Sequence, residues 1–343
     1  MIKFNKVYNT LDQLQLDRSV DINHFHNYGN YRLVHTCTAA LEIAALALDI
    51  KEGDEVIMPS YTFVSTANAF VLRGAKIIFC DVTEDMNMDL DFLEQLFTEK
   101  TKAVVVVHYA GCGADMKRLS DLCGQKNIAL IEDAAQAIGV YQEDKLLGTF
   151  GDFGCISFHQ TKNIHCFEGG MLIINNDKYS HVVDQIINMG TDKDEFFAGE
   201  VKQYTWQRMG SSYKMDDLRA SYLRPQFSVL DYINRRRVEI VTRYQEALKD
   251  YDIFTRKDHN GHLFYIKVED RDALKNYLFE KGVEAFSHYE PLHESKAGKK
   301  FGRTPSELTR TVDAYKLLRL PVYFELTNKE IDYITSCIKE YYE

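Results

Sequence analysis

Short apolar runs of β type alternate with helical segments through the first half of the chain. The β-branched run at 104–107 has the composition of a strand that is covered on both faces. Strands are predicted at 56–58, 77–80, 104–107 and 129–131. Helices are predicted to open at Thr36 or Thr38 and to cover 65–73, 90–97 and 116–125. This alternation predicts an α/β fold with a largely parallel sheet, whose ligands bind beyond the carboxyl ends of the strands.

The second half is more helical. After two further strands, at 155–158 and 171–174, it predicts a helix over 179–188 and a long surface loop over 191–208. A helical stretch over 216–248 should be kinked or broken at Pro225. A smaller α+β unit then follows, with strands at 263–268 and 283–286 and helices at 272–280 and 328–341. Residues 1–35 are weakly patterned, with a loop over 27–31. We therefore expect a large domain over 1–230 and a small one over 231–343.

Composition narrows the function classes. The chain has 343 residues, 45% hydrophobic and 27% charged, with a net charge of −10 and no large basic cluster, which argues against a nucleic-acid partner. No apolar run approaches the length of about 20 residues that crosses a bilayer, and the N-terminus lacks an apolar signal core. The seven cysteines are scattered without a Cys-x-x-Cys pair, and no cluster has zinc-site spacing. These features predict a cytoplasmic protein with reduced thiols and no metal.

One lysine stands out between two apolar runs. Lys162 follows the run at 155–158 and precedes Gly169-Gly170 and the next run. A lysine held between buried strands is costly unless its amine is paired or used. One use is a Schiff base with an aldehyde cofactor, which requires a lowered amine pKa. The alternative is an exposed lysine in a turn between strands.

The residues around other strand ends fit the same cofactor, pyridoxal 5'-phosphate (PLP). Asp133 closes an apolar run and is placed to pair with the pyridine nitrogen, so that the ring accepts electrons from a substrate carbanion. The amides of Thr38 and Ala39 at a helix start, with the Ser157 hydroxyl, are placed to hold the phosphate.

Two further side chains complete this expected site. The ring of Phe63 is expected to lie over the cofactor face, and Gln136 to reach its ring hydroxyl. Taken singly, each residue has an ordinary reading: Phe63 as core, Asp133 as a cap or ion-pair partner, and Gln136 as helix surface. It is the combination with Lys162 that favours PLP.

These motifs resemble a known family. Glu132-Asp133-Ala134-Ala135-Gln136, Ser157-Phe158-His159-x-x-Lys162-Asn163 and Glu168-Gly169-Gly170 are similar to the DegT/DnrJ/EryC1 family of nucleotide-sugar aminotransferases. The segments 59–69 and 210–215, and His288-Tyr289-x-Pro291-Leu292-His293, resemble its dTDP-4-amino-4,6-dideoxygalactose transaminase branch. The resemblance runs from about Cys37 to the C-terminus.

The resemblance implies a PLP-dependent transferase of fold type I, usually a homodimer with active sites between subunits. It implies that Lys162 forms the Schiff base and moves the proton, that His159 lies near the cofactor, and that Ser212 reaches the cofactor of the partner subunit. The implied reaction moves an amino group from L-glutamate to C4 of a dTDP-linked 4-keto-6-deoxyhexose. His288, Tyr289 and His293 are candidates for the sugar side, or ordinary surface and domain-interface residues.

Three departures from the family pattern leave alternatives open. The resemblance implies that the family carries about twenty to thirty more residues before the Thr38 helix. The usual glycine before Glu168 is Phe167, which is disfavoured if its φ is positive. Arg219 and Arg224 stand where small or apolar residues are more common. A 3-keto-sugar aminotransferase, a deoxysugar dehydratase and a weakened relative that only binds ligands therefore remain alternatives.

Overall fold

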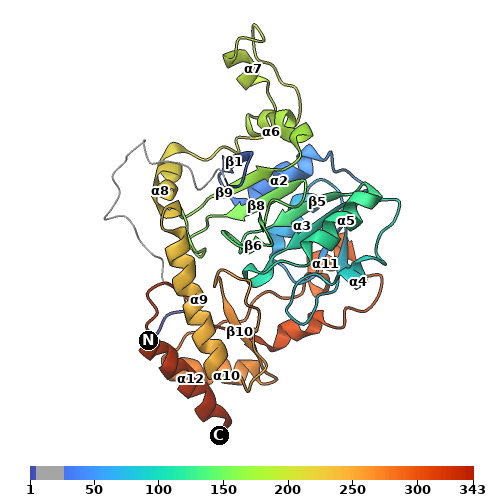
Figure 1. The fold of residues 1–343 in the computed structure, drawn as a ribbon. Helices are drawn as coiled ribbons and strands as arrows, with labels where there is room; N and C mark the ends of the chain where they lie inside the picture. The colour runs from blue at the N-terminus through green and yellow to red at the C-terminus, as the bar shows by residue number, and fades with distance from the viewer. Residues whose placement is uncertain (5–26) are drawn as a thin grey trace.

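The computed structural model describes residues 1–4 and 27–343 (Figure 1). Its centre is one eight-stranded sheet, in which the strands from β8 to β11 run parallel and β1 and β9 pair antiparallel. In spatial order the strands are β1 (Tyr31–Val34), β9 (Gly170–Ile174), β8 (Phe153–Ser157), β5 (Ala129–Asp133), β4 (Thr101–Val107), β2 (Glu55–Pro59), β3 (Lys76–Cys80) and β11 (Gly302–Arg303). The expected α/β fold with a largely parallel sheet is confirmed.

Both faces of this sheet are buried, which explains its continuous apolar strands. In β4, Val104 and Val106 pack into one hydrophobic cluster, whereas Ala103 and Val105 pack into another. In β2, Ile57 packs into the first of these clusters, whereas Val56 and Met58 on either side of it pack into the second. Because successive side chains of a strand point to opposite faces, most positions of a central strand are then apolar, with exceptions such as the buried Glu132 of β5.

The helices of the described chain lie on the two faces of the sheet, on the C-terminal core or, beyond α6, on a projecting segment. They are α2 (Cys37–Ala47), α3 (Val64–Val71), α4 (Leu90–Leu93), α5 (Met116–Lys126), α6 (Ser180–Ile187), α7 (Lys193–Phe197), α8 (Asp217–Phe227), α9 (Leu230–Ala247), α10 (Arg271–Glu280), α11 (Lys296–Phe301) and α12 (Asn328–Tyr342). Buried residues of α2, α3 and α6 belong to one cluster, and those of α4, α5 and α8 to the other. A small hairpin, β6 (Tyr141–Gln142) with β7 (Lys145–Leu146), lies apart from the sheet.

The long helical stretch expected over 216–248 is interrupted close to Pro225, as the sequence predicted. Pro225 lies in the last turn of α8, and α9 begins after a break at residues 228–229. The start of α9 packs on the large sheet through Leu230 and Ile233, and its later part packs on the C-terminal core through Ile240 and Tyr244. The helix thus runs from one core to the other (Figure 1). The domain boundary expected at residue 230 stays a prediction.

The C-terminal core holds a correction to the expected strands. The small sheet pairs β10 (Phe264–Lys267) antiparallel with β12 (Leu317–Leu320), and α10 and α12 pack with it. The segment 283–286 forms no strand, because only Val283 and Phe286 at its ends make bridges, to Ile2 and Arg319. Within the described residues, no helix combines the length and apolar character needed to span a bilayer.

Two other expectations are wrong in detail. The expected loop at 27–31 ends in β1, whose first residue is Tyr31. The expected loop at 191–208 contains α7, which has Asp194 and Glu195 in its first turn, where they complement the helix dipole. In Figure 1, α7 projects from the body of the molecule beyond α6.

Candidate active site

A cavity of about 550 Å³ opens at the carboxyl ends of the parallel strands. Val107 ends β4, Asp133 ends β5 and Ser157 ends β8, and all three line the cavity. The start of α2 lines it from another side. In an open α/β sheet this edge is where ligands bind, because strand ends and helix starts converge there.

Asp133 lies buried at the cavity floor. Its Oδ2 accepts a hydrogen bond from Oγ1 of Thr66 at 2.7 Å, and its Oδ1 accepts one from the Ala135 amide at 3.2 Å. Burial raises the pKa of the Asp133 carboxyl, against the lowering effect of Thr66. A cationic ligand group beside it would offset that cost of burial.

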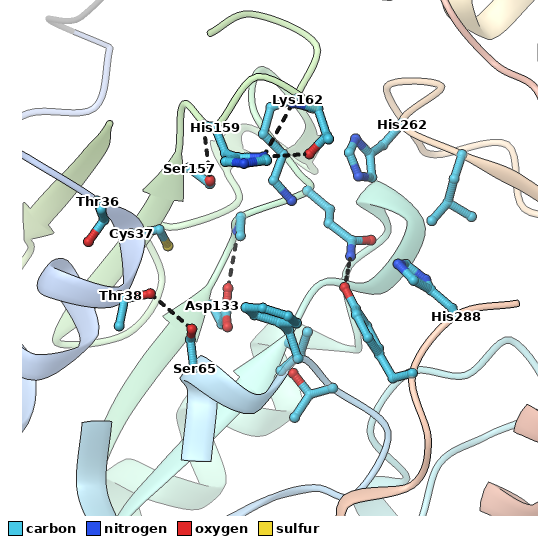
Figure 2. Close-up of a pocket in the computed structure, with 18 of the residues that line it drawn as sticks. Thr36, Cys37, Thr38, Ser65, Asp133, Ser157, His159, Lys162, His262 and His288 are labelled. Carbon is cyan, nitrogen blue, oxygen red and sulfur yellow. Dashed lines mark hydrogen bonds between the residues drawn. The ribbon is translucent and has the colours of Figure 1, made fainter. Parts of the chain in front are cut away.

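Lys162 extends into the same cavity from the turn that links β8 to β9 (Figure 2). Its backbone amide donates to the His159 carbonyl at 2.9 Å, which fixes the turn. Burial lowers the pKa of the Lys162 amine, whereas the negative charge of Asp133 raises it. Within the described part of the chain, this amine has no hydrogen-bond or ion-pair partner. The lysine is therefore positioned and favoured toward its neutral, nucleophilic form.

Hydroxyl groups and helix-start amides gather on one side of Asp133. Oγ1 of Thr38 donates to Oγ of Ser65 at 2.9 Å, and Ser157 lies above them in Figure 2. The α2 N-cap, Thr36, accepts from the Ala39 amide at 3.0 Å, so this amide already has a partner, and Ala39 does not line the cavity. Thr38 and Ser157 thus line the cavity and Ala39 does not, and the phosphate contacts expected of all three stay predictions.

Gln136 and Phe63 form another part of the wall. Oε1 of Gln136 accepts from the Ala110 amide at 2.8 Å, and its Nε2 donates to the Tyr289 hydroxyl at 3.0 Å. Phe63 is 54% exposed, and its ring centroid lies 5.9 Å from that of Tyr289. Both side chains line the cavity, as the expected cofactor contacts require.

The two remaining expected contacts differ in place. His159 lines the cavity, with Nδ1 2.9 Å from Oγ1 of Thr161 and Nε2 3.5 Å from Oε1 of Glu168. Ser212 lies outside the cavity of its own chain, on the exposed strand-like segment that bridges to Asn188. Its expected contact with a partner subunit stays a prediction.

Of the three residues expected on the sugar side, two line the cavity and one does not. His288 and Tyr289 line the cavity with stacked rings, 3.9 Å apart, and Nδ1 of His288 lies 2.9 Å from the Tyr109 hydroxyl. His293 is turned elsewhere, with its Nδ1 2.6 Å from Oγ of Ser60. Burial lowers the pKa of His288 well below its ordinary value, so its imidazole is neutral at pH 7.

A second cavity histidine, His262, was not expected. Its Nδ1 lies 3.2 Å from Oδ1 of Asn163, the residue that follows Lys162. Nδ2 of Asn163 donates to Oδ1 of Asn234 at 2.8 Å and to the Asn260 carbonyl at 3.0 Å. Because those partners only accept, the orientation of the Asn163 amide is fixed and its Oδ1 faces His262.

The protonation of His262 follows from this network. An oxygen opposite Nδ1 requires Nδ1 to carry the proton, so Nε2 of the neutral ring is an acceptor. Burial lowers the pKa of His262 well below its ordinary value, and the positive charges of Lys162, Arg237 and Arg319 lower it further, as does His288. In Figure 2, His262 and His288 lie across the cavity from the Thr38 side.

Sequence reasoning also missed Cys37, Ser65, Arg237 and Arg319, which line the cavity. One signal was available for Arg319, a charged residue within the apolar strand Leu317-Leu318-Arg319-Leu320. His262 directly precedes an apolar run and carries no comparable local signal. Cys37 and Ser65 are set by their helices, α2 and α3, rather than by a motif.

Comparisons with known proteins agree with this geometry. The family model described as DegT/DnrJ/EryC1/StrS aminotransferase family matches residues 21–339. The chain belongs to this aminotransferase family. The mixed α/β fold, with its parallel-dominated sheet flanked by helices, matches solved aminotransferases of the family.

Three solved structures illustrate the likeness. The aminotransferase TlmJ from Streptoalloteichus hindustanus is 27% identical, with a TM-score of 0.85, over 93% of this chain and 88% of that chain. DesV from S. venezuelae, solved in complex with a ketimine intermediate, is 25% identical, with a TM-score of 0.86, over 100% and 98%. The putative sugar aminotransferase Spr1654 from Streptococcus pneumoniae, in its PMP form, is 26% identical, with a TM-score of 0.83, over 93% and 89%. Spr1654 also has a solved PLP form.

Proposed function

We propose that this aminotransferase is a PLP-dependent sugar aminotransferase. It moves an amino group from L-glutamate to a dTDP-linked 4-keto-6-deoxyhexose and gives a dTDP-4-amino-4,6-dideoxyhexose. The single observation that carries the proposal is the cavity that brings Lys162 and Asp133 together at the strand ends. The family match and the PLP and PMP forms of Spr1654 support it.

The donor set of the cavity fits PLP. An amine without a partner in the described chain, Lys162, fits an aldehyde, and the buried carboxylate of Asp133 fits a pyridinium nitrogen. The hydroxyls of Thr38, Ser65 and Ser157, near the start of α2, fit a phosphate. Gly170 lets β9 approach this helix start, since a Cβ there would lie 2.4 Å from the Thr36 carbonyl oxygen.

Each residue then has a distinct task. When bound, PLP supplies an aldehyde that links to amines and a ring that accepts the electron pair of a substrate carbon. Asp133 keeps a proton on the ring nitrogen by its charge. Lys162 would hold the aldehyde, and its free Nζ would carry a proton to and from the reacting carbon atoms as a general base and then acid. Phe63 and Gln136 orient the ring, with His159 nearby.

The sugar is proposed to bind at the cavity wall across from Thr38, where His262, His288 and Tyr289 lie. Neutral imidazoles of His262 and His288 and the Tyr289 hydroxyl suit sugar hydroxyl groups, which both donate and accept hydrogen bonds. The His288-Tyr289-x-Pro291-Leu292-His293 motif supports C4 amination by its resemblance to the dTDP-4-amino-4,6-dideoxygalactose transaminase branch. His293, hydrogen-bonded to Ser60 outside the cavity, acts at most through the position of this loop.

A lysine at position 162 favours transamination over the dehydratase alternative, since related dehydratases carry histidine there. Amination at C3 is the remaining enzymatic alternative, and a protein that binds ligands without turnover is the non-enzymatic one. The three give different products: a 4-amino sugar, a 3-amino sugar or none.

We further propose a cytoplasmic homodimer with shared active sites. The segment 191–208 beyond α6, which we call the arm, carries exposed apolar side chains, including Phe197 at 72% and Trp206 at 77% exposure. Exposed apolar residues of this size favour burial against another surface. Ser212 comes shortly after this arm in the chain. If the arm packs against the partner subunit, Ser212 is carried toward the partner's cofactor.

The test is one assay with the PLP-loaded protein, L-glutamate and dTDP-4-keto-6-deoxyglucose. Mass spectrometry should detect the dTDP-amino-sugar, and NMR should place the new amine on C4. The variant Lys162→Ala, which retains the fold but lacks the amine, should give no product. An amine on C3, or a product of dehydration, would overturn the assignment in favour of the corresponding alternative.

A further inference from the structure

Arg319 of β12 lies in the cavity without an anionic partner. Its Nε is buried and has no hydrogen-bond partner among residues 1–4 and 27–343. Its positive charge acts on three tyrosines around it, Tyr61, Tyr109 and Tyr289. Each of those hydroxyls has its pKa raised by burial, so all three are neutral near pH 7. The cation is thus enclosed by aromatic rings that do not neutralise it.

The other cavity arginine provides a contrast. Nε of Arg237 donates to the Gly261 carbonyl at 3.0 Å, and its Nη2 donates to the His262 carbonyl at 2.8 Å. Those backbone acceptors explain the presence of Arg237 as a brace for the 261–262 turn. Arg319 has no such role in the described chain, and a buried guanidinium without partners is unfavourable for folding. A ligand anion would remove that cost.

The N-terminal residues add a second contact to Arg319. The guanidinium carbon lies 4.6 Å from the ring centroid of Phe4, which also lines the cavity. Phe4 is held in place, because its amide donates to Oε2 of Glu284 at 3.1 Å and Ile2 bridges to Val283. The neighbouring Lys3 pairs with Glu284 at 2.8 Å. One face of the guanidinium is therefore covered by the Phe4 ring, and Arg319 lines the cavity from that position.

We propose that Arg319, covered by Phe4, binds a carboxylate group of the amino-acid donor. This inference rests on the proposed function, which supplies the donor. A guanidinium edge matches a carboxylate in two parallel hydrogen bonds. The cofactor phosphate is assigned to the Thr38 side, whereas Arg319 acts electrostatically on Lys162, His262 and His288. The donor must bring its amine to Lys162 and its carboxylates to the surrounding wall.

Binding of glutarate, a dicarboxylate without an amine, tests the site in the PLP-loaded full-length protein. Calorimetry should find glutarate affinity reduced about 10- to 100-fold in Arg319→Gln, as expected when a charged hydrogen-bonding partner is lost. Arg319→Lys should recover part of it, since lysine keeps the charge but not the fork. Arg118→Gln, which removes an exposed arginine on α5, should bind as the wild type does. Equal glutarate affinity in Arg319→Gln and wild type would overturn the proposal.

A second binding measurement, with inorganic pyrophosphate, distinguishes a carboxylate site at Arg319 from a nucleotide site. Inorganic pyrophosphate should bind Arg319→Gln and wild type alike. If pyrophosphate binding depends on Arg319 and glutarate binding does not, the arginine belongs to the nucleotide-sugar side and the proposal is wrong. The thermal midpoint of ligand-free Arg319→Gln should equal or exceed that of the wild type, because an unpaired buried cation is removed. A structural role for Arg319 would lower it.

Phe4→Leu provides a milder test. It keeps apolar volume and removes the ring face, so glutarate affinity should fall about two- to fivefold, the size of a modest cation–π contact. The glutamate half-reaction of the PLP-loaded protein then separates the two proposals. Wild-type turnover with an unchanged half-saturation concentration in Arg319→Gln would contradict only the carboxylate site. No wild-type response to any amino donor would contradict the proposed function, while Arg319-dependent glutarate binding would still stand.

Discussion

Oδ1 of Asn163 lies 3.2 Å from Nδ1 of His262, and this contact ties a cavity histidine to the residue beside Lys162. The amide of Asn163 cannot rotate without turning its oxygen against the Asn260 carbonyl. The histidine therefore presents an unprotonated Nε2 to the cavity at neutral pH. This acceptor suits a donor on the substrate or on the Lys162 amine.

The protonation of His262 is directly measurable. In nitrogen-15 long-range correlation spectra, His262 should carry its proton on Nδ1 and should not titrate between pH 6 and 8. The reason is burial beside Lys162, Arg237 and Arg319, which lowers its pKa well below the ordinary 6.5. Since the unfolded chain gains this proton near pH 6.5 and the folded one does not, the linked stability should fall as the pH drops below that value. A proton on Nε2 at pH 7 would contradict the network, and His262→Gln assigns the signal.

The Lys162 amine should react as an unusually acidic ammonium group. In protein freed of cofactor, acylation of Lys162 followed by peptide mass spectrometry should rise with pH through a midpoint below 10.5, because burial favours the neutral amine. Asp133→Asn removes a negative charge that raises the pKa of this amine, so its midpoint should move to lower pH. The exposed Lys51 serves as an internal reference. An upward shift in Asp133→Asn would exclude the electrostatic coupling of the two residues.

Gly170 should matter for cofactor binding through α2. A Cβ at this position would lie 2.4 Å from the Thr36 carbonyl oxygen and 2.5 Å from the Cys37 nitrogen, so the helix start must move. Gly170→Ala should weaken PLP binding by about tenfold or more, equivalent to about 1.4 kcal/mol. The control Gly124→Ala lies on an exposed helix position with open space, and should raise stability by about 0.5–1 kcal/mol. Unchanged PLP affinity in Gly170→Ala would show that the helix start is not part of the site.

Phe167 stands where the sequence comparison expected glycine, and its φ is +66°. Its ring packs on Tyr222 at 5.1 Å and on His165 at 5.5 Å, contacts that offset the backbone cost. A side chain in this left-handed region costs about 1–2 kcal/mol. Phe167→Gly should therefore be more stable than Phe167→Ala by up to about 1 kcal/mol, measured by urea unfolding. The reverse order, usual at helix interiors, would mean that the position is unstrained.

The fold and the centre of the site were largely readable from local patterns. Asp133 ends β5, and Lys162 lies in the turn that follows β8, so both positions follow from the apolar runs that precede them. The segment 283–286 was expected to be a strand because its composition suits one. In the structure it makes only isolated bridges, and another segment pairs with β10. The strand that pairs with β10 is β12, which the sequence analysis did not predict.

The other residues of the site depend on tertiary structure. His262, Arg319 and Phe4 come from three distant parts of the chain and meet only when the small sheet packs beside the large one. The bond that orients His262 joins residues 99 apart in sequence. Such contacts leave no spacing pattern in a single sequence. The structure likewise shows which residue caps α2, since the Ala39 amide donates to Oγ1 of Thr36.

The glutamate half-reaction tests the central claim most directly. The absorbance of the PLP-loaded protein is recorded before and after addition of L-glutamate, alongside Lys162→Ala loaded in the same way. The account predicts that glutamate converts the visible absorbance of the aldehyde form to that of the amine form in the wild type, with release of 2-oxoglutarate. Lys162→Ala should lack the lysine-bound spectrum and turn over at least about 10²-fold more slowly, since it has lost its acid–base group. An identical spectrum and rate in the two proteins would contradict the assignment of Lys162.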